Sequence, residues 1–124
     1  MDRQRHVRSP QQRGVLRTVD TAINAWINTS CEIDPLTVSW LGVVAESGCK
    51  YLSELQFPNP LVVGLAVTRL GDSSVTYRLA IFEEPADAVA AVGHWVHVYV
   101  DRTTRKPVPI PDAIRALLEK ARVE

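Results

Sequence analysis

Residues 61–111 read LVVGLAVTRLGDSSVTYRLAIFEEPADAVAAVGHWVHVYVDRTTRKPVPIP, and this segment predicts most of the fold. It contains strand-like runs at 61–70, 74–83 and 88–101, separated by short polar turns. In the middle run, Val75, Tyr77, Leu79 and Ile81 alternate with smaller or polar residues, which is the period of two expected of a strand with one buried face. The pattern predicts an antiparallel meander in which a tight Gly71-Asp72 turn joins the first two strands.

The segments on either side of this meander complete the layout. Apolar residues recur every three or four positions and predict a helix over 14–28; they are Val15, Val19, Ala22, Ile23, Trp26 and Ile27. A further strand is predicted over 38–52, with Gly42 and Gly48 as bulge or bend points. Pro111 precedes a short terminal helix. We expect one α+β domain over 1–124, an antiparallel sheet wrapped around one long central helix.

Composition limits the function. The chain carries 14 basic and 14 acidic residues, so nucleic acid is not expected as the main partner. Cys31 and Cys49 are too few for a disulfide framework and fit a reducing cytosol. No apolar run is long enough to span a membrane, and the N-terminus lacks the apolar core of a signal peptide, which predicts a cytoplasmic protein. His94 and His97 fall on opposite faces of one strand, and no Cys/His set has zinc spacing, so no metal is expected.

Several motifs, in this order, resemble the hotdog-fold acyl-CoA thioesterases of the 4-hydroxybenzoyl-CoA type. They are DTAIN at 20–24, ESGCKY at 46–51, LGDSS at 70–74, GHWVHVYVD at 93–101 and RKPVPIP at 105–111. The resemblance covers roughly residues 15–118. It implies the hotdog fold, hydrolysis of acyl-CoA thioesters, no cofactor other than the coenzyme A of the substrate, and a homodimer or homotetramer that places the ligand between subunits.

In that family a segment Asp-x-x-Gly-His-Val-Asn-Asn precedes the central helix, and its carboxylate acts on the thioester. The nearest match here is DRQRHV, in which Asp2 and His6 keep the family's spacing while Arg5 replaces glycine and Arg8-Ser9 replace the paired asparagines. The family's first strand, which precedes this aspartate, has no counterpart, and we interpret the motif as truncated or degenerate. One reading makes Asp2 the catalytic carboxylate; the other makes DRQRHV a chance match in a chain terminus.

Glu46 is a second candidate carboxylate, against the alternative of an edge residue that pairs with Lys50 or an arginine. For the coenzyme A phosphates we predict contacts from the hairpin and from the end of the last strand; the residues are Arg69, Ser73, Ser74, Arg102, Arg105 and Lys106. The alternative there is a solvated hairpin and a charged strand end. Two functions therefore stand: an acyl-CoA thioesterase, or a non-catalytic acyl-CoA-binding or structural hotdog dimer.

Overall fold

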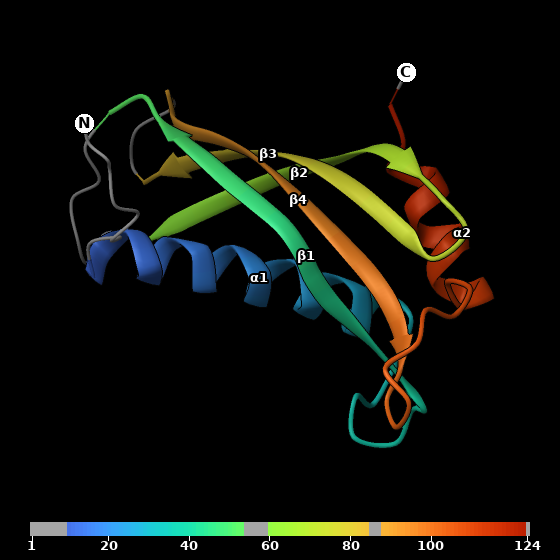
Figure 1. Ribbon diagram of the computed structural model, residues 1–124. Helices are drawn as coiled ribbons and strands as arrows, with labels where there is room; N and C mark the ends of the chain where they lie inside the picture. Colours follow the sequence, from blue (N-terminus) through green and yellow to red (C-terminus); the bar gives the residue numbers. More distant parts are fainter. Residues whose placement is uncertain (1–9, 54–59, 85–87, 124) are drawn as a thin grey trace, which may run out of the picture.

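The computed structural model describes residues 10–53, 60–84 and 88–123. Along the chain its elements are α1 (Pro10–Ser30), β1 (Trp40–Tyr51), β2 (Leu61–Leu70), β3 (Ser74–Glu83), β4 (Val89–Asp101) and α2 (Asp112–Lys120). The strands form one antiparallel sheet in the order β1-β4-β3-β2, and this curved sheet lies across the long helix α1 (Figure 1). This is the α+β layout that the sequence predicts.

Helix α1 forms because one of its faces is apolar along its whole length. Val15, Val19, Ile23 and Ile27 recur every fourth residue and are all buried against the sheet. The helix is longer than the predicted 14–28, because a proline in the first turn lacks only an N–H that has no helical acceptor there. It ends where Glu32 adopts a positive φ of 55°, a conformation that a continuing helix does not allow.

The inner face of the sheet meets α1 through the residues that alternate along β3 and β4. Those with little or no exposed surface are Val75, Tyr77, Leu79, Ile81, Ala91, Trp95, His97 and Tyr99. The predicted strands 61–70 and 74–83 agree with β2 and β3, and β4 begins one residue later than predicted. Alternation predicted these strands well because the sheet has one covered and one open face.

The predicted irregularity of the first strand is misplaced. The register of β1 against β4 shifts between Val44 and Glu46, not at Gly42 or Gly48. Those glycines instead make room for aromatic rings of β4. A Cβ on Gly48 would lie 2.7 Å from Cε1 of His94, and one on Gly42 would lie 3.4 Å from the Tyr99 ring.

Helix α2 fastens the β2–β3 hairpin to the end of the sheet. Its Ile114 and Leu118 are fully buried. The guanidinium of Arg115 donates to the carbonyl oxygens of Gly71 and Asp72, at 2.6 and 3.1 Å. No helix in the described part of the chain has the length and hydropathy that a membrane span requires.

Candidate active site

A carboxylate of α1 meets two side chains of β4 beneath the sheet. Oδ1 of Asp20 lies 3.0 Å from Nε2 of His97 and 3.3 Å from Nε1 of Trp95. Because a carboxylate oxygen only accepts, both ring nitrogens donate to it. Together these three residues form what we call the Asp20 cluster.

The local structure explains why the three side chains converge. Leu16, Asp20 and Asn24 are spaced by four along the helix and form a half-buried row beside the apolar one. Trp95 and His97 are two apart on β4 and therefore point to the same face, toward α1. Trp95 is 2% exposed and His97 is 1% exposed, whereas the Asp20 side chain is 39% exposed. The donors are thus fixed in the core and the carboxylate reaches solvent.

His97 is held as a neutral imidazole. Burial lowers its pKa below the ordinary value of 6.5, and the hydrogen bond and negative charge of Asp20 oppose this only in part. With Nε2 donating to Asp20, the bare Nδ1 is buried and accepts no hydrogen bond from any described residue. The ring of Tyr77 packs edge-on against that of His97 at 5.7 Å between centroids, and its buried hydroxyl also lacks a partner in the described residues. Burial raises the Tyr77 pKa, so this hydroxyl stays protonated.

The Asp20 cluster lies at an open margin of the molecule. Val44 on the edge strand β1 is the register partner of His97, which places it in the row that faces the helix side. Val44 is nevertheless 43% exposed, so α1 does not cover this edge. The β-bulge follows directly after Val44, and bulges are frequent beside active sites because they redirect neighbouring side chains.

Glu46 lies on the other face of the sheet. It pairs in register with Val96, whose neighbours Trp95 and His97 point inward, so Glu46 points outward. Its Oε2 lies 2.8 Å from Nε2 of His94, with both side chains about half or more exposed, at 67% and 49%. This placement favours the alternative of Glu46 as an edge-strand residue with a side-chain partner, and that partner is His94, through a hydrogen bond, rather than Lys50 or an arginine.

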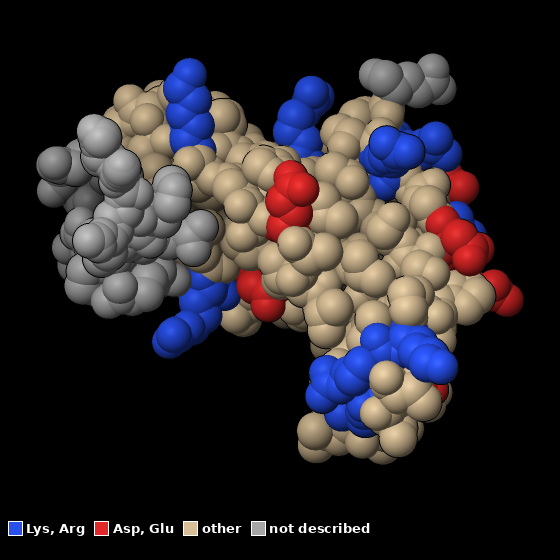
Figure 2. Space-filling model, viewed as in Figure 1, with Lys and Arg blue, Asp and Glu red and all other residues tan. Residues whose placement is uncertain are grey.

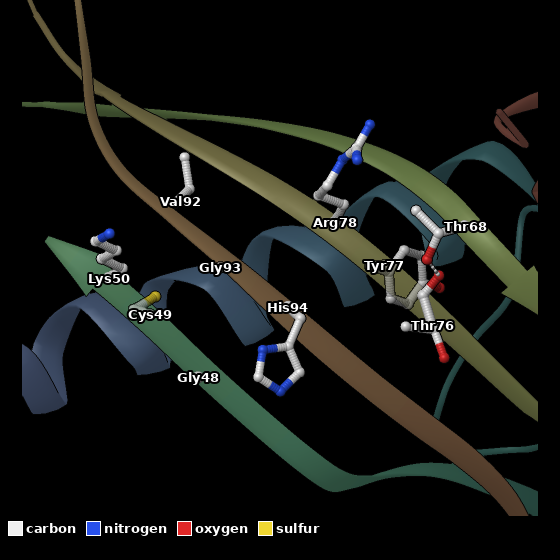
Figure 3. Close-up of a pocket in the computed structure, with 10 residues that line it drawn as sticks. All are labelled: Gly48, Cys49, Lys50, Thr68, Thr76, Tyr77, Arg78, Val92, Gly93 and His94. Atoms are coloured by element: carbon white, nitrogen blue, oxygen red, sulfur yellow. Dashed lines mark hydrogen bonds between the residues drawn. The ribbon is translucent and has the colours of Figure 1, made fainter. Parts of the chain in front are cut away.

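The same outer face carries a shallow groove of about 680 Å³. Figure 3 shows the residues that line it, drawn from all four strands, with the ribbon of α1 behind the sheet. In Figure 3 the side chains of Lys50 and Arg78 lie on either side of Val92. A sheet therefore separates this groove from the Asp20 cluster.

The predicted cations after β4 sit on a compact loop, residues 101–107, which we call the cationic loop. Oδ1 of Asp101 accepts the backbone N–H of Thr103 and of Thr104, both at 2.8 Å, which holds the loop and lowers the pKa of the Asp101 carboxyl. Figure 2 shows Lys and Arg side chains gathered over this lobe of the molecule.

The three cations of the loop are not equivalent. The guanidinium of Arg102 donates to the carbonyl oxygens of Val38, at 3.0 Å, and of Pro35, so it braces the loop that precedes β1. Arg105 and Lys106 are exposed, and neither forms an ion pair with any other residue that the structure describes. These two remain available for an anionic ligand.

The hairpin candidates lie at the same end of the sheet as the cationic loop. The carbonyl oxygen of Ser73 accepts the N–H of Tyr99 at 2.8 Å, near the end of β4. Ser73 and Ser74 are half-buried, and Arg69 is exposed on the outer face, where it pairs in register with Thr76. The hairpin is thus held in place beside the loop, and its Arg69 forms no ion pair with any residue that the structure describes.

Asp2 and His6 lie outside the described residues, and their catalytic role stays a prediction. Among the described residues no three His, Cys, Asp or Glu side chains are grouped as a metal site would require. The Asp20 cluster was missed by sequence reasoning, which noted Asp20 only for its likeness to the family's helix. An aspartate beside an apolar helical stripe, together with an inward-facing histidine on a strand, is the signal that could have revealed it.

Comparisons with known proteins identify the family of this chain. A family model described as the Thioesterase-like superfamily matches residues 1–118. The crystal structure of the PA5185 protein from Pseudomonas aeruginosa strain PAO1 is 31% identical with a TM-score of 0.85, over 100% of this chain and 90% of that one. No curated protein matches the sequence.

Two more distant structures share the fold. The 1,4-dihydroxy-2-naphthoyl-CoA thioesterase Slr0204 from Synechocystis is 14% identical with a TM-score of 0.73, over 86% of this chain and 80% of that one. The SAV2348 protein from Staphylococcus aureus, solved in complex with CoA, is 15% identical with a TM-score of 0.73, over 100% and 79%. The family match, which spans nearly the whole sequence, confirms the predicted hotdog-type resemblance: the chain belongs to the thioesterase-like superfamily.

Proposed function

We propose that this protein hydrolyses acyl-CoA thioesters to a free acid and coenzyme A. The observation that carries the proposal is the family match over residues 1–118, in a chain whose described part holds a half-exposed, fixed carboxylate on the helix side of the sheet. The CoA complex of the structurally similar SAV2348 protein supports a ligand of this type.

Coenzyme A carries phosphates, and the cationic loop is where we propose that they bind. Arg105 and Lys106 supply the free charges, and Arg102 holds the loop in place. Each exposed phosphate contact is worth about 1 kcal/mol, so the double change Arg105→Ala with Lys106→Ala should raise KM for acyl-CoA about tenfold or more. Lys120→Ala removes an exposed cation of α2 and serves as the control. An unchanged KM in the double variant would move the phosphate site elsewhere.

We further propose that two copies pair through β1. This strand of 12 residues forms one edge of the sheet, and an edge with free backbone groups pairs readily with a second strand. Since β1 runs antiparallel to α1 (Figure 1), twofold pairing of β1 with its copy would bring the cationic loop of one subunit beside the first turns of α1 of the other. Such a pairing would also cover the open margin at Val44 and enclose the Asp20 cluster.

The test is thiol release from a panel of aliphatic and aromatic acyl-CoAs, with the wild type compared with Asp2→Asn and Glu46→Gln. We expect thiol release by the wild type and no loss in Glu46→Gln. If the wild type binds acyl-CoA and releases no thiol above the buffer rate, the protein is a binding member of the family and the enzyme proposal is wrong. Loss of activity in Glu46→Gln alone would assign the catalytic carboxylate to the outer face.

A further inference from the structure

We propose that Asp20 is a catalytic residue: its second carboxylate oxygen, Oδ2, acts as the general base for the water that attacks the thioester. Trp95 and His97 are positioning residues, which act by holding Oδ1. The proposal rests on the proposed function, because a base of this kind has no role without a thioester substrate.

The first support is that the carboxylate is fixed. A general base has to be held in one orientation relative to the water that it deprotonates. Oδ1 of Asp20 takes two hydrogen bonds from buried rings, at 3.0 and 3.3 Å. Both rings belong to neighbouring inward positions of one strand, so neither can turn away without disturbing the core. With Oδ1 fixed in this way, the direction of Oδ2 is set as well.

The second support is that the fixed carboxylate remains accessible. The hydrogen bonds that described residues donate to this carboxylate both end on Oδ1, and the side chain is 39% exposed on the side of the sheet where Val44, the register partner of His97, is also exposed. Other described carboxylates differ in this respect. Asp34 and Asp101 accept backbone N–H groups of exposed turns, and Glu46 is hydrogen-bonded to His94 on the outer face. Asp20 combines a rigid support with an open side.

The third support is that His97 cannot replace Asp20 as the base. Burial lowers the pKa of His97, and its Nδ1 is enclosed in the core away from any substrate. Its Nε2 is already engaged as a donor to Asp20. The titratable groups that contact this imidazole are the carboxylate of Asp20 and the phenol of Tyr77. The His97 side chain is only 1% exposed, so a substrate does not reach it. The geometry therefore assigns His97 to support and Asp20 to chemistry.

The proposed step balances as hydrolysis. Oδ2 removes a proton from water while the water oxygen bonds to the thioester carbonyl carbon, and the carbonyl π electrons move to the carbonyl oxygen. The tetrahedral intermediate then re-forms its carbonyl group and the C–S bond breaks. The departing thiolate takes the proton from the Asp20 carboxyl, which leaves a free acid, the thiol of coenzyme A and the original carboxylate.

The test compares kcat and KM of Asp20→Asn with those of the wild type and of Asp112→Asn, a matched change of an exposed carboxylate at the start of α2. An asparagine retains an oxygen that accepts both hydrogen bonds, so the variant should fold, and thermal melting checks this. We expect kcat to fall about 100- to 10,000-fold, the usual contribution of a general base, with KM within about threefold of the wild type. Asp112→Asn should match the wild type.

Chemical rescue separates catalysis from structure. In Asp20→Ala, added formate should restore part of kcat, because a small carboxylate can occupy the vacated position. His97→Phe and Trp95→Phe remove one donor each and should lower kcat without abolishing it, while His97→Gln, whose amide can still donate, should retain more activity than His97→Phe. If Asp20→Asn does not fold, Asp20→Glu carries the same test, since it displaces the carboxylate by one methylene and should lower kcat with KM retained.

The outcomes are distinct. An unchanged kcat in Asp20→Asn with an active wild type overturns the assignment and leaves the proposed function standing. If only KM rises, and only for acyl groups that carry a hydroxyl, then Asp20 binds the acyl group, and its role as general base is overturned. A lost kcat that formate does not restore in Asp20→Ala indicates a structural role. No thiol release by the wild type removes the proposed function itself.

Discussion

Replacing His97 by phenylalanine should change the acid stability of the protein far more than its stability at neutral pH. The ring is 1% exposed and makes one hydrogen bond, to Asp20. Losing a hydrogen bond to a charged group costs about 1.5–3 kcal/mol, at the low end here because water can reach the half-exposed carboxylate. Removing a buried, unpaired Nδ1 returns about 1–3 kcal/mol. The two effects nearly cancel, so at pH about 7.5 His97→Phe should unfold within about 1 kcal/mol of the wild type.

Acidification should separate the two proteins. Burial lowers the pKa of His97 in the folded protein below 6.5, so between the two values the unfolded chain binds more protons than the folded one. Wild-type stability should therefore fall as the pH drops from about 7.5 to about 5.5, by up to about 1.4 kcal/mol for each unit that separates the two pKa values. The same loss should be absent from His97→Phe.

Among the described residues, the other groups with a shifted pKa titrate outside this window. The pKa of the Asp101 carboxyl is lowered, so its contribution is present above its unfolded value of 3.8 and is lost only at lower pH. The raised pKa values of Cys31 and Tyr77 act in the alkaline range. Urea unfolding at both pH values measures the effect. A wild type that is equally stable or more stable at the lower pH would refute a neutral, buried His97.

Three further substitutions test the packing of the sheet. Gly93→Ala should destabilise the fold by more than about 2 kcal/mol, because its Cβ would lie 2.5 Å from the backbone oxygen of Gly48. Gly48→Ala should cost less than about 1 kcal/mol, because its Cβ meets only the movable ring of His94. Equal losses of the free energy of unfolding in urea would contradict this. Tyr77→Phe removes a buried hydroxyl without a described partner and should raise the free energy of unfolding by about 1 kcal/mol, with a decrease arguing against an unpaired hydroxyl.

The strands were readable from the sequence because their pattern is local. Along β3 the buried Val75, Tyr77, Leu79 and Ile81 alternate with residues on the open face, and each assignment needs only its neighbours. The bulge in β1 was predicted at the wrong position because glycine in a strand suggests a local bend. The glycines of β1 instead leave space for aromatic rings of the adjacent strand β4. Gly48 lies opposite His94, and that pairing depends on the register of the sheet.

The Asp20 cluster could not be read in the same way. Asp20 is separated from Trp95 by 75 residues and from His97 by 77, so their meeting depends on how α1 crosses the sheet. Glu46 looked equally suitable in the sequence, and only the register of β1 shows that it faces the other way. Among the predicted cations, Arg102, Arg105 and Lys106 lie within one short segment, yet Arg102 donates hydrogen bonds to backbone carbonyl oxygens. The charges can be read from the sequence, but which cation braces the loop and which ones are exposed depends on the folded conformation.

Hydrolysis of acyl-CoA with Asp20 as the base is tested most directly by measuring the rate at which the purified protein releases coenzyme A from acyl-CoA, followed with a thiol reagent. We expect thiol release that saturates with substrate, is retained in Asp112→Asn and is lost in Asp20→Asn. An acyl-CoA that binds and remains intact in the presence of the wild type would contradict it.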